Sequence, residues 1–251
     1  MTKNNLNLSN NATLGSWITL AHPAIAEIMS KSDFDWLTID LEHSTISIRE
    51  AEDLIRIISL NKKIPLVRLT SNDENQIKRI MDAGANGIIV PMIKTKEDAL
   101  KAVQFCKYPP QGKRGVGLAR AQGYGEKFDQ YVKWEKNNSI IIVQIEHYKA
   151  VENLQDILSV KGVDGFFVGP YDLSASLNIP GKFTHPKFIK YMLLIKKHLK
   201  NKNIIKGFHV VEPDKKQLKT KIKEGYNFIG YSLDIRLLNH SISNLKNKIK
   251  L

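Results

Sequence analysis

Eight short apolar runs recur along the chain, and each is followed by a polar or amphipathic segment long enough for a helix. Short apolar runs bounded by turn-forming residues are typical of strands that are buried on both faces, as in parallel sheets. The predicted strands cover residues 14–20, 35–41, 64–69, 87–92, 140–146, 164–169, 204–210 and 227–233. Eight strand–helix units in succession predict an α/β protein with a (β/α)8 TIM barrel. A doubly wound sheet of eight strands is the alternative, because only closure of the sheet distinguishes the two.

The segments between these runs carry the start and stop signals of helices. Ser47 and Thr95 each stand three residues before an acidic residue, which is the spacing of a capping box. Gly84, Gly162 and Gly225 lie where helices should end. The predicted helices cover residues 23–31, 47–61, 73–83, 95–107, 148–159, 186–201 and 213–224.

The chain of 251 residues is long enough for one such barrel, and we expect residues 1–251 to form a single domain with a disordered or peripheral segment at 1–13. Residues 108–138 contain five glycines and are too short for a second domain. We therefore expect this segment to form a flexible loop over the active face. Cys106 cannot form a disulfide within the chain, because it is the only cysteine, and we expect it to be a buried small residue.

The formal net charge of +13 is concentrated in the last quarter of the chain, where residues 190–251 contain 15 Lys and Arg but four Asp and Glu. Solvated helix faces are the simplest interpretation, with an anionic substrate or a polyanion surface as the alternatives. No apolar stretch approaches the roughly 18 residues of a membrane span, and the first 11 residues lack a hydrophobic signal region. We expect a cytoplasmic protein without a membrane or a specific nucleic-acid partner.

Two of the predicted strands lead into a carboxylate. Glu146 ends the fifth strand, and Asp172 follows shortly after the sixth. The carboxyl ends of parallel strands meet on one face, where α/β folds place their ligands, so we expect the two carboxylates to lie side by side. Oxygen ligands without Cys or His favour Mg²⁺ or Mn²⁺, and such a cation polarises a carbonyl or enolate oxygen. Two acids in salt bridges at the barrel rim are the alternative.

Further polar residues fall on the same predicted face. His43 follows the second strand, Arg68 ends the third, and Gln144 lies near the end of the fifth. Taken singly, Arg68 could pair with a neighbouring acid and His43 could be an ordinary loop histidine. Their coincidence at one end of the sheet favours a functional site.

Six motifs occur in order at the predicted strand ends and in the long loop. They are Asp-Leu-Glu-His at 40–43, Pro-Leu-Val-Arg at 65–68, Val-Pro-Met at 90–92, Tyr-Pro-Pro-Gln-Gly with Arg-Gly within 108–115, Gln-Ile-Glu at 144–146 and Gly-Pro-Tyr-Asp-Leu-Ser at 169–174. Together they resemble the HpcH/HpaI family of metal-dependent 2-oxo acid aldolases, which includes 4-hydroxy-2-oxoheptanedioate and 2-dehydro-3-deoxyglucarate aldolases. The resemblance covers roughly residues 15–233 and implies a barrel of the phosphoenolpyruvate/pyruvate type.

The resemblance implies a role for each matched residue. Glu146 and Asp172 would hold the divalent cation, Mg²⁺ or Mn²⁺. Gln144, together with the backbone of Tyr171 and Asp172, would position the pyruvate moiety of a 2-oxo acid substrate. Arg68 would stabilise the enolate that forms when a carbon–carbon bond beside the 2-oxo group breaks, because a guanidinium neutralises the developing charge.

The same resemblance makes His43 the general base. The family motif matched at 81–84 carries an acid that raises the basicity of this histidine, and here it is Asp82. Asp82 ends the third predicted helix, however, and the helices of a barrel run back toward the face opposite the strand carboxyl ends. Either a neighbouring subunit supplies it, since family members are commonly homo-oligomers and often trimers of dimers, or a local acid in the substrate site, such as Asp40, orients the histidine. An acid that caps the turn before the fourth strand is the structural alternative.

The leading hypothesis is a lyase that cleaves a 4-hydroxy-2-oxo acid reversibly to pyruvate and an aldehyde. Leu41, residues 44–47 and Tyr171 depart from the family pattern and leave the aldehyde open. A CoA-ester lyase or related enolate enzyme on the same barrel is the enzymatic alternative. A basic nucleic-acid or anionic-surface binder with a vestigial site is the alternative of another class. Replacing Arg68 by alanine is expected to abolish turnover with little loss of stability.

Overall fold

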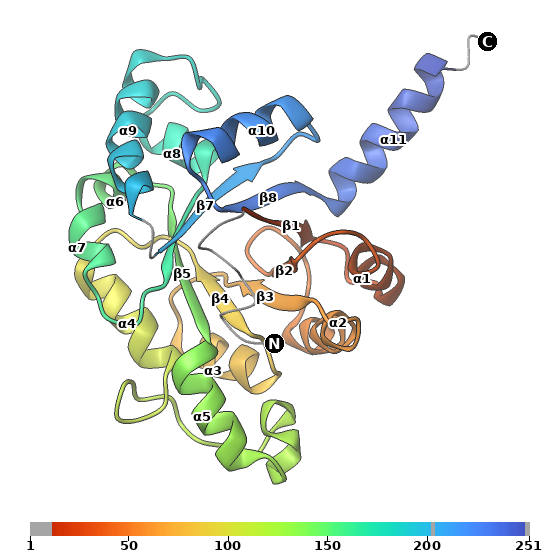
Figure 1. The fold of residues 1–251 in the computed structure, drawn as a ribbon, viewed down its shortest axis with the longest axis vertical. Helices are drawn as coiled ribbons and strands as arrows, with labels where there is room; N and C mark the ends of the chain where they lie inside the picture. Colours follow the sequence, from red (N-terminus) through yellow and green to blue (C-terminus); the bar gives the residue numbers. More distant parts are fainter. Residues whose placement is uncertain (1–11, 202–203, 249–251) are drawn as a thin grey trace.

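The computed structural model describes residues 12–201 and 204–248, and its eight strands close into a parallel barrel (Figure 1). Each strand pairs with the next one in sequence, and the last strand pairs with the first to complete the ring. Closure confirms the predicted (β/α)8 TIM barrel and excludes the doubly wound sheet. The strands are β1 (Thr13–Ile18), β2 (Trp36–Asp40), β3 (Ile64–Arg68), β4 (Gly87–Val90), β5 (Ile140–Ile145), β6 (Gly165–Val168), β7 (Ile205–Val210) and β8 (Phe228–Leu233).

Helices alternate with the strands, and their ends follow the sequence signals. Both capping boxes are present, because the Ser47 and Thr95 side chains each accept a hydrogen bond from the backbone N–H three residues on. Gly84, Gly162 and Gly225 have positive φ angles after their helices, as the helix-stop signals predicted. The helices are α1 (Pro23–Ser30), α2 (Ile48–Leu60), α3 (Glu74–Asp82), α4 (Lys96–Cys106), the 3-10 helix η2 (Arg120–Gly125), α5 (Phe128–Asn138), α6 (Tyr148–Glu152), α7 (Leu154–Leu158), α8 (Pro170–Ser176), α9 (Pro186–Lys196), the 3-10 helix η3 (Lys197–Lys200), α10 (Lys215–Glu224) and α11 (Asp234–Lys248).

Large rings fill the interior of the barrel. Trp36 and Phe228 stack there with their centroids 4.0 Å apart and their planes 2° from parallel. Gly15 makes room for this pair, because a Cβ at that position would lie 2.0 Å from the Trp36 ring. A second, larger core lies between the strands and the helices, as the alternation of side chains along each strand requires. The barrel is therefore packed inside, and its functional residues must lie at one of its ends.

The prediction that residues 108–138 lie over the active face is wrong, because this segment lies at the opposite end of the barrel. It contains η2 and α5, and the Arg120 Nη1 atom donates a hydrogen bond of 2.8 Å to the Ala83 carbonyl, just before β4. The physical reason is topological. Because α4 runs back along the barrel, the connection from α4 to β5 has to lie at the face where the strands begin.

Two helices near functional positions were also not predicted. α8 begins directly after Gly169, so Tyr171 and Asp172 lie in a helical turn rather than in a loop. α11 follows β8 and projects away from the barrel (Figure 1). Thr13, which we assigned to the N-terminal segment, is the first residue of β1, whereas residues 1–11 lie outside the described part of the chain. Within the described residues, no helix is long and apolar enough to cross a membrane.

Candidate functional site

The two carboxylates predicted to share a site come from neighbouring strands. β5 pairs with β6 through Ile145 and Val168, so Glu146 and the start of α8 leave the sheet at the same edge. A cavity of about 250 Å³ opens at this edge, and its lining includes His43, Arg68 and Asp172. Four strand ends that are far apart in the sequence thus converge on one face, as predicted.

Glu146 is buried and held by hydrogen bonds to both carboxylate oxygens. Its Oε1 atom accepts a 2.5 Å hydrogen bond from the backbone N–H of Met92, and the Gln144 side chain donates to Oε2. Met92 follows β4 with a φ of +57°, a conformation that non-glycine residues rarely adopt, and so turns its N–H toward the site. Burial raises the pKa of Glu146, although these hydrogen bonds act in the opposite direction. A buried carboxylate whose pKa stays raised despite its hydrogen bonds is suited to a cation.

Gly169 provides space beside this carboxylate. A Cβ at Gly169 would lie 3.3 Å from the Glu146 Cβ atom and 3.5 Å from the Gln144 Nε2 atom. The Gln144 Oε1 atom is buried and has no hydrogen-bond partner among the described residues, which leaves an acceptor next to the two carboxylates. A buried acceptor of this kind needs a partner that the chain itself does not provide.

Asp40 and Arg68 form a bidentate ion pair across β2 and β3, where they are register partners. Arg68 Nε donates to Asp40 Oδ1 at 2.9 Å, and Arg68 Nη2 donates to Oδ2 at 2.6 Å. The guanidinium also lies over the Trp17 ring, 4.6 Å from its centroid. Burial alone would raise the pKa of Asp40, but the hydrogen bonds and charge of Arg68 hold it below its usual value. Arg68 is thereby fixed at the edge of the cavity.

Asp40 differs from its predicted role in substrate binding. Both of its oxygens are engaged by Arg68, and Oδ1 also accepts the backbone N–H groups of Glu42 and His43 at 3.0 and 3.3 Å. It does not hydrogen-bond the His43 imidazole, so it does not orient that ring. In this arrangement Asp40 positions Arg68 and the turn after β2.

Glu42 is a site residue that we did not single out from the sequence. Its Oε2 atom lies 3.2 Å from Arg68 Nη1 and 3.9 Å from His43 Nε2. Burial raises the pKa of Glu42 to about 7, and the charges of Glu146, Asp40 and Asp172 add to this effect while Arg68 opposes it. The Asp-Leu-Glu-His run places Glu42 at the strand end, but its pKa depends on acids from other strands.

His43 and Asp82 lie at opposite ends of the barrel. The His43 side chain is 61% exposed at the rim of the cavity. Asp82 ends α3, and its Oδ1 atom accepts a hydrogen bond of 2.9 Å from Arg114, whose guanidinium is buried over the Tyr108 ring. Burial raises the pKa of Asp82, and Arg114 opposes the increase. The predicted position of Asp82, at the face opposite the strand carboxyl ends, is therefore confirmed. Within one chain, Asp82 does not reach His43.

The residues present fit a hard divalent cation that is held by few protein ligands. Among the residues that the structure describes, no group of three or more His, Cys, Asp and Glu side chains has an arrangement that could hold a metal. Glu146 and Asp172 supply carboxylate oxygens and leave the remaining coordination positions to water or substrate, as is usual for Mg²⁺. Their charges interact, because Asp172 contributes to the raised pKa of Glu146.

Comparisons with known proteins show which family the chain resembles. Residues 13–241 match the family model described as HpcH/HpaI aldolase/citrate lyase. The chain is 36% identical over 234 residues to the hydroxypyruvate/pyruvate aldolase of Roseobacter denitrificans, covering 92% of this chain and 90% of that protein. It is 32% identical to the 2-keto-3-deoxy-L-rhamnonate aldolase of Escherichia coli K12, covering 91% and 85%.

The fold comparison gives the same result. A crystal structure of an HpcH/HpaI aldolase/citrate lyase family protein from Burkholderia cenocepacia superposes with a TM-score of 0.92 and 28% identity, covering 100% of both chains. The range matched by the family model includes every strand of the barrel, and the two curated relatives cover 92% and 91% of the chain. The chain therefore belongs to the HpcH/HpaI aldolase/citrate lyase family.

Proposed function

We propose that this protein is an aldolase that cleaves a 4-hydroxy-2-oxo acid reversibly to pyruvate and an aldehyde, with Mg²⁺ or Mn²⁺ as its cofactor. The observation that carries the proposal is one cavity lined by Asp172, a fixed arginine and a rim histidine, with the Glu146 carboxylate bound to Gln144 of the same cavity wall. The names of the two curated relatives, which are pyruvate and 2-keto acid aldolases, support the same chemistry.

Glu146 and Asp172 would hold the cation, which when bound supplies positive charge that polarises the 2-oxo group of the substrate. Gln144 lies beside Glu146 with its free Oε1 acceptor, so it orients the pyruvate half together with the backbone of Tyr171 and Asp172. Gly169 has no side chain and so leaves space for the pyruvate half beside Glu146 and Gln144.

Arg68 faces the developing enolate. Its two hydrogen bonds to Asp40 prevent the side chain from rotating, so its charge is in place before the reaction and needs no reorganisation. The 2-oxo group gains negative charge as the bond between C3 and C4 breaks. Arg68 would stabilise that charge through its guanidinium, which lines the cavity and is also 3.2 Å from Glu42 through Nη1.

His43 accepts the proton of the 4-hydroxyl group in the cleavage direction. As that O–H bond breaks, the C4 oxygen becomes the aldehyde, and the electrons of the C3–C4 bond form the enolate. Protonation at C3 then yields pyruvate. Imidazole suits this transfer near neutral pH. The exposed position of His43 at the rim supports a role at the aldehyde half of the substrate rather than at the buried pyruvate half.

We also propose that the enzyme is a homo-oligomer. α11 projects from the barrel and exposes an apolar stripe at helical spacing, consisting of Ile235, Leu238, Ile242 and Leu245 (Figure 1). An exposed stripe of this length normally packs against another surface. In such an assembly, Asp82 of one subunit acts on His43 of a neighbouring subunit, since the two residues lie at opposite ends of one barrel.

Mixing two inactive variants tests this shared site. Co-expression of His43→Ala and Asp82→Asn chains should restore up to about one quarter of the wild-type sites, because half of randomly paired dimers contain both variants and one of their two sites has both native residues. Each variant expressed alone is the control. If no activity returns in mixed oligomers of confirmed composition, Asp82 does not act across a subunit boundary.

Exchange of the pyruvate methyl protons tests the core of the function without knowledge of the aldehyde. Wild-type protein with Mg²⁺ should exchange these protons for deuterium in D₂O, followed by NMR, because enolate formation labilises them. Chelation of the metal and the Glu146→Gln variant should each abolish exchange. Exchange that is absent in the wild type, or insensitive to chelation, contradicts the proposal.

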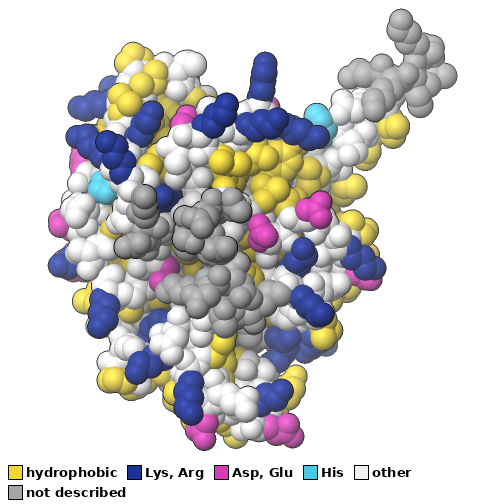
Figure 2. Space-filling model, in the orientation of Figure 1, with side chains coloured by type: hydrophobic (Ala, Val, Ile, Leu, Met, Phe, Trp, Pro, Cys, Tyr) yellow, Lys and Arg dark blue, Asp and Glu magenta, His cyan; other side chains and the backbone are white. Residues whose placement is uncertain are grey.

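The two alternative functions predict different binding. A CoA-ester lyase should bind acetyl-CoA more tightly than pyruvate in isothermal titration, and this result would reverse our assignment. A polyanion binder should retain nucleic acid with a steep salt dependence. On the face that Figure 2 draws, Lys and Arg side chains gather along the upper edge, over α9 and α10, and are scattered elsewhere among uncharged and acidic side chains.

A further inference from the structure

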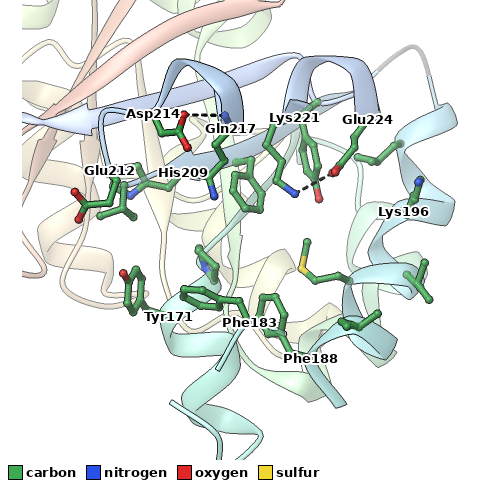
Figure 3. A pocket seen from close by; sticks show the side chains of 18 residues that line it. Tyr171, Phe183, Phe188, Lys196, His209, Glu212, Asp214, Gln217, Lys221 and Glu224 are labelled. Carbon is green, nitrogen blue, oxygen red and sulfur yellow. Dashed lines mark hydrogen bonds and ion pairs between the residues drawn. The ribbon is translucent and has the colours of Figure 1, made fainter. Parts of the chain in front are cut away.

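A second and larger cavity opens beside the catalytic cavity. It has a volume of about 510 Å³ and lies between α9 and the segment formed by β7 and α10 (Figure 3). Its walls are mainly aromatic and aliphatic, and include Phe183, Phe188, Met192, Phe208 and Tyr226. A volume of this size falls in the range of about 300–1,000 Å³ that is typical of small-molecule sites.

The two cavities adjoin each other. Pro170, Tyr171, His209 and Val211 line both of them. Tyr171 follows the end of β6 directly before Asp172, and His209 lies on β7, so these side chains stand between the cavities in a region that we call the neck (Figure 3). A molecule held at Asp172 therefore lies next to the second cavity, with the half-exposed Tyr171 ring between the two.

A row of aromatic rings leads outward from this neck. The Tyr171 and Phe183 rings meet edge to face with centroids 5.0 Å apart, and Phe183 packs against Phe188 at 5.3 Å (Figure 3). His209 is partly buried, and the loss of water around its ring lowers its pKa to about 4, so it is neutral at pH 7. Its Nε2 atom lies 3.1 Å from the Ser232 carbonyl oxygen. The neck is thus uncharged and suited to an apolar group.

The charged side chains around the cavity are largely neutralised by one another. Lys221 pairs with Glu224 at 2.9 Å and lies over the Phe208 ring at 4.5 Å. Glu212 pairs with Arg236 at 2.5 Å. Lys196 lies at the end of the cavity away from Tyr171 (Figure 3). An apolar group therefore matches the part of the cavity that adjoins the neck better than a charged one.

We propose that this cavity receives the tail of the aldehyde half of the substrate, and that the tail is an alkyl or aryl group. The inference rests on the proposed aldolase function, which places the pyruvate half between Glu146 and Asp172. Carbon atoms beyond C4 then have to leave the catalytic cavity on its open side, where Tyr171 and the neck lie. The half-exposed rings of Tyr171 and Phe183 would be covered by such a tail.

A series of aldehydes tests the proposal in the direction of carbon–carbon bond formation. With pyruvate and Mg²⁺, kcat/KM should rise from acetaldehyde through butanal to hexanal by up to about fourfold per methylene, which corresponds to about 0.8 kcal/mol per buried methylene. 3-Phenylpropanal should react faster than acetaldehyde. Succinic semialdehyde, whose tail carries a carboxylate, should show no such increase in kcat/KM over acetaldehyde.

Filling the cavity should remove this preference. Met192→Trp, on α9, should lower kcat/KM for hexanal by at least about tenfold and leave the value for acetaldehyde within about twofold. Leu100→Trp, on the exposed face of α4, is the matched control and should change neither value. Phe183→Ala gives a second measurement on a partly exposed residue and should weaken the selectivity for 3-phenylpropanal.

The outcomes are distinguishable. Equal kcat/KM values along the series, or a Met192→Trp variant that affects all aldehydes alike, would overturn the proposal even if pyruvate proton exchange is normal. A change in oligomeric mass of Met192→Trp in light scattering, with unchanged aldehyde selectivity, would assign the cavity to a second copy of the chain instead. Loss of proton exchange in the wild type would reject the aldolase function itself.

Discussion

Replacing Arg68 by alanine should destabilise the protein as well as inactivate it, in contrast to the small loss of stability expected from the sequence. The side chains of Arg68, Asp40 and Glu42 are 13%, 4% and 14% exposed. Removal of the Arg68 guanidinium therefore leaves the Asp40 and Glu42 carboxylates without their partner and with little access to water. The expected loss of stability comes from the ion pair of Arg68 with Asp40, which the structure shows, and not from the position of Arg68 at the end of β3.

The magnitude follows from the burial of Asp40. Breaking a buried ion pair by removing one partner costs about 3–5 kcal/mol. We expect about 3 kcal/mol, because Glu42, whose pKa is already about 7, can take up a proton and so relieve part of the repulsion. For a chain of this length, 1 kcal/mol corresponds to about 2–4 °C in Tm, so the variant should lose about 6–12 °C.

The loss should depend on pH. In the wild type the pKa of Asp40 is lowered, so its contribution to stability is present above its unfolded pKa and is lost as pH falls through the folded value. Without Arg68, burial is opposed only by the backbone hydrogen bonds from Glu42 and His43, and the folded pKa of Asp40 rises above the unfolded value. The variant then loses stability as pH rises through that range. The stability difference between the two proteins should therefore narrow from pH 7 to about pH 4.

Thermal unfolding followed by circular dichroism at both pH values measures the effect. Arg56→Ala is the matched control, because Arg56 forms ion pairs with Glu52 and Asp53 but is 42% exposed, and it should lose less than about 4 °C. The reasoning fails if Arg68→Ala loses no more than Arg56→Ala at pH 7. The reasoning also fails if the Tm difference between Arg68→Ala and the wild type becomes larger as the pH is lowered from 7 to about 4.

Three further predictions concern single positions. Gly169→Ala should slow pyruvate proton exchange by at least about tenfold with little change in Tm, because its Cβ would lie 3.3 Å from the Glu146 Cβ atom; normal exchange would show that the space is not needed. Gly15→Ala should lower the free energy of unfolding in urea by about 3 kcal/mol or more, at or above the ~1–3 kcal/mol that is typical of overpacking, because its Cβ would lie 2.0 Å from the Trp36 ring. An unchanged urea midpoint would contradict this packing. Burial raises the pKa of the Cys106 thiol to about 12, so a thiol reagent at about pH 8 should label it only after unfolding; rapid labelling of native protein would be inconsistent with this burial.

Local signals in the sequence were sufficient for the elements and for part of the site. The capping boxes at Ser47 and Thr95 involve residues only three positions apart, so they are readable without the fold. Glu146 and Asp172 were predictable because an apolar run that ends in a carboxylate places that carboxylate where a buried strand surfaces. The distance of Asp82 from His43 followed from the alternating direction of strands and helices.

Properties that depend on several strands at once were not predictable in this way. Asp40 was predicted to bind substrate, but the register of β2 with β3 sets it opposite Arg68, which takes both of its oxygens. The pKa of Glu42 depends on burial and on Glu146 and Asp172, which arrive from other strands. The segment at 108–138 was misplaced because its glycines indicate a loop and not the face on which that loop lies.

The sequence by itself determined the order of strands and helices, the end of the barrel that carries the chemistry, and the residue types that meet there. Hydrophobic periodicity, helix caps and strand ends each involve only a few neighbouring residues, so they can be recognised in the sequence without the fold. Only the tertiary structure decided that the sheet closes, that Arg68 is held by Asp40, and that Tyr171 and His209 line two adjoining cavities. Those features require side chains more than 25 residues apart to meet, and their positions depend on strand register around the whole ring, which no local preference specifies.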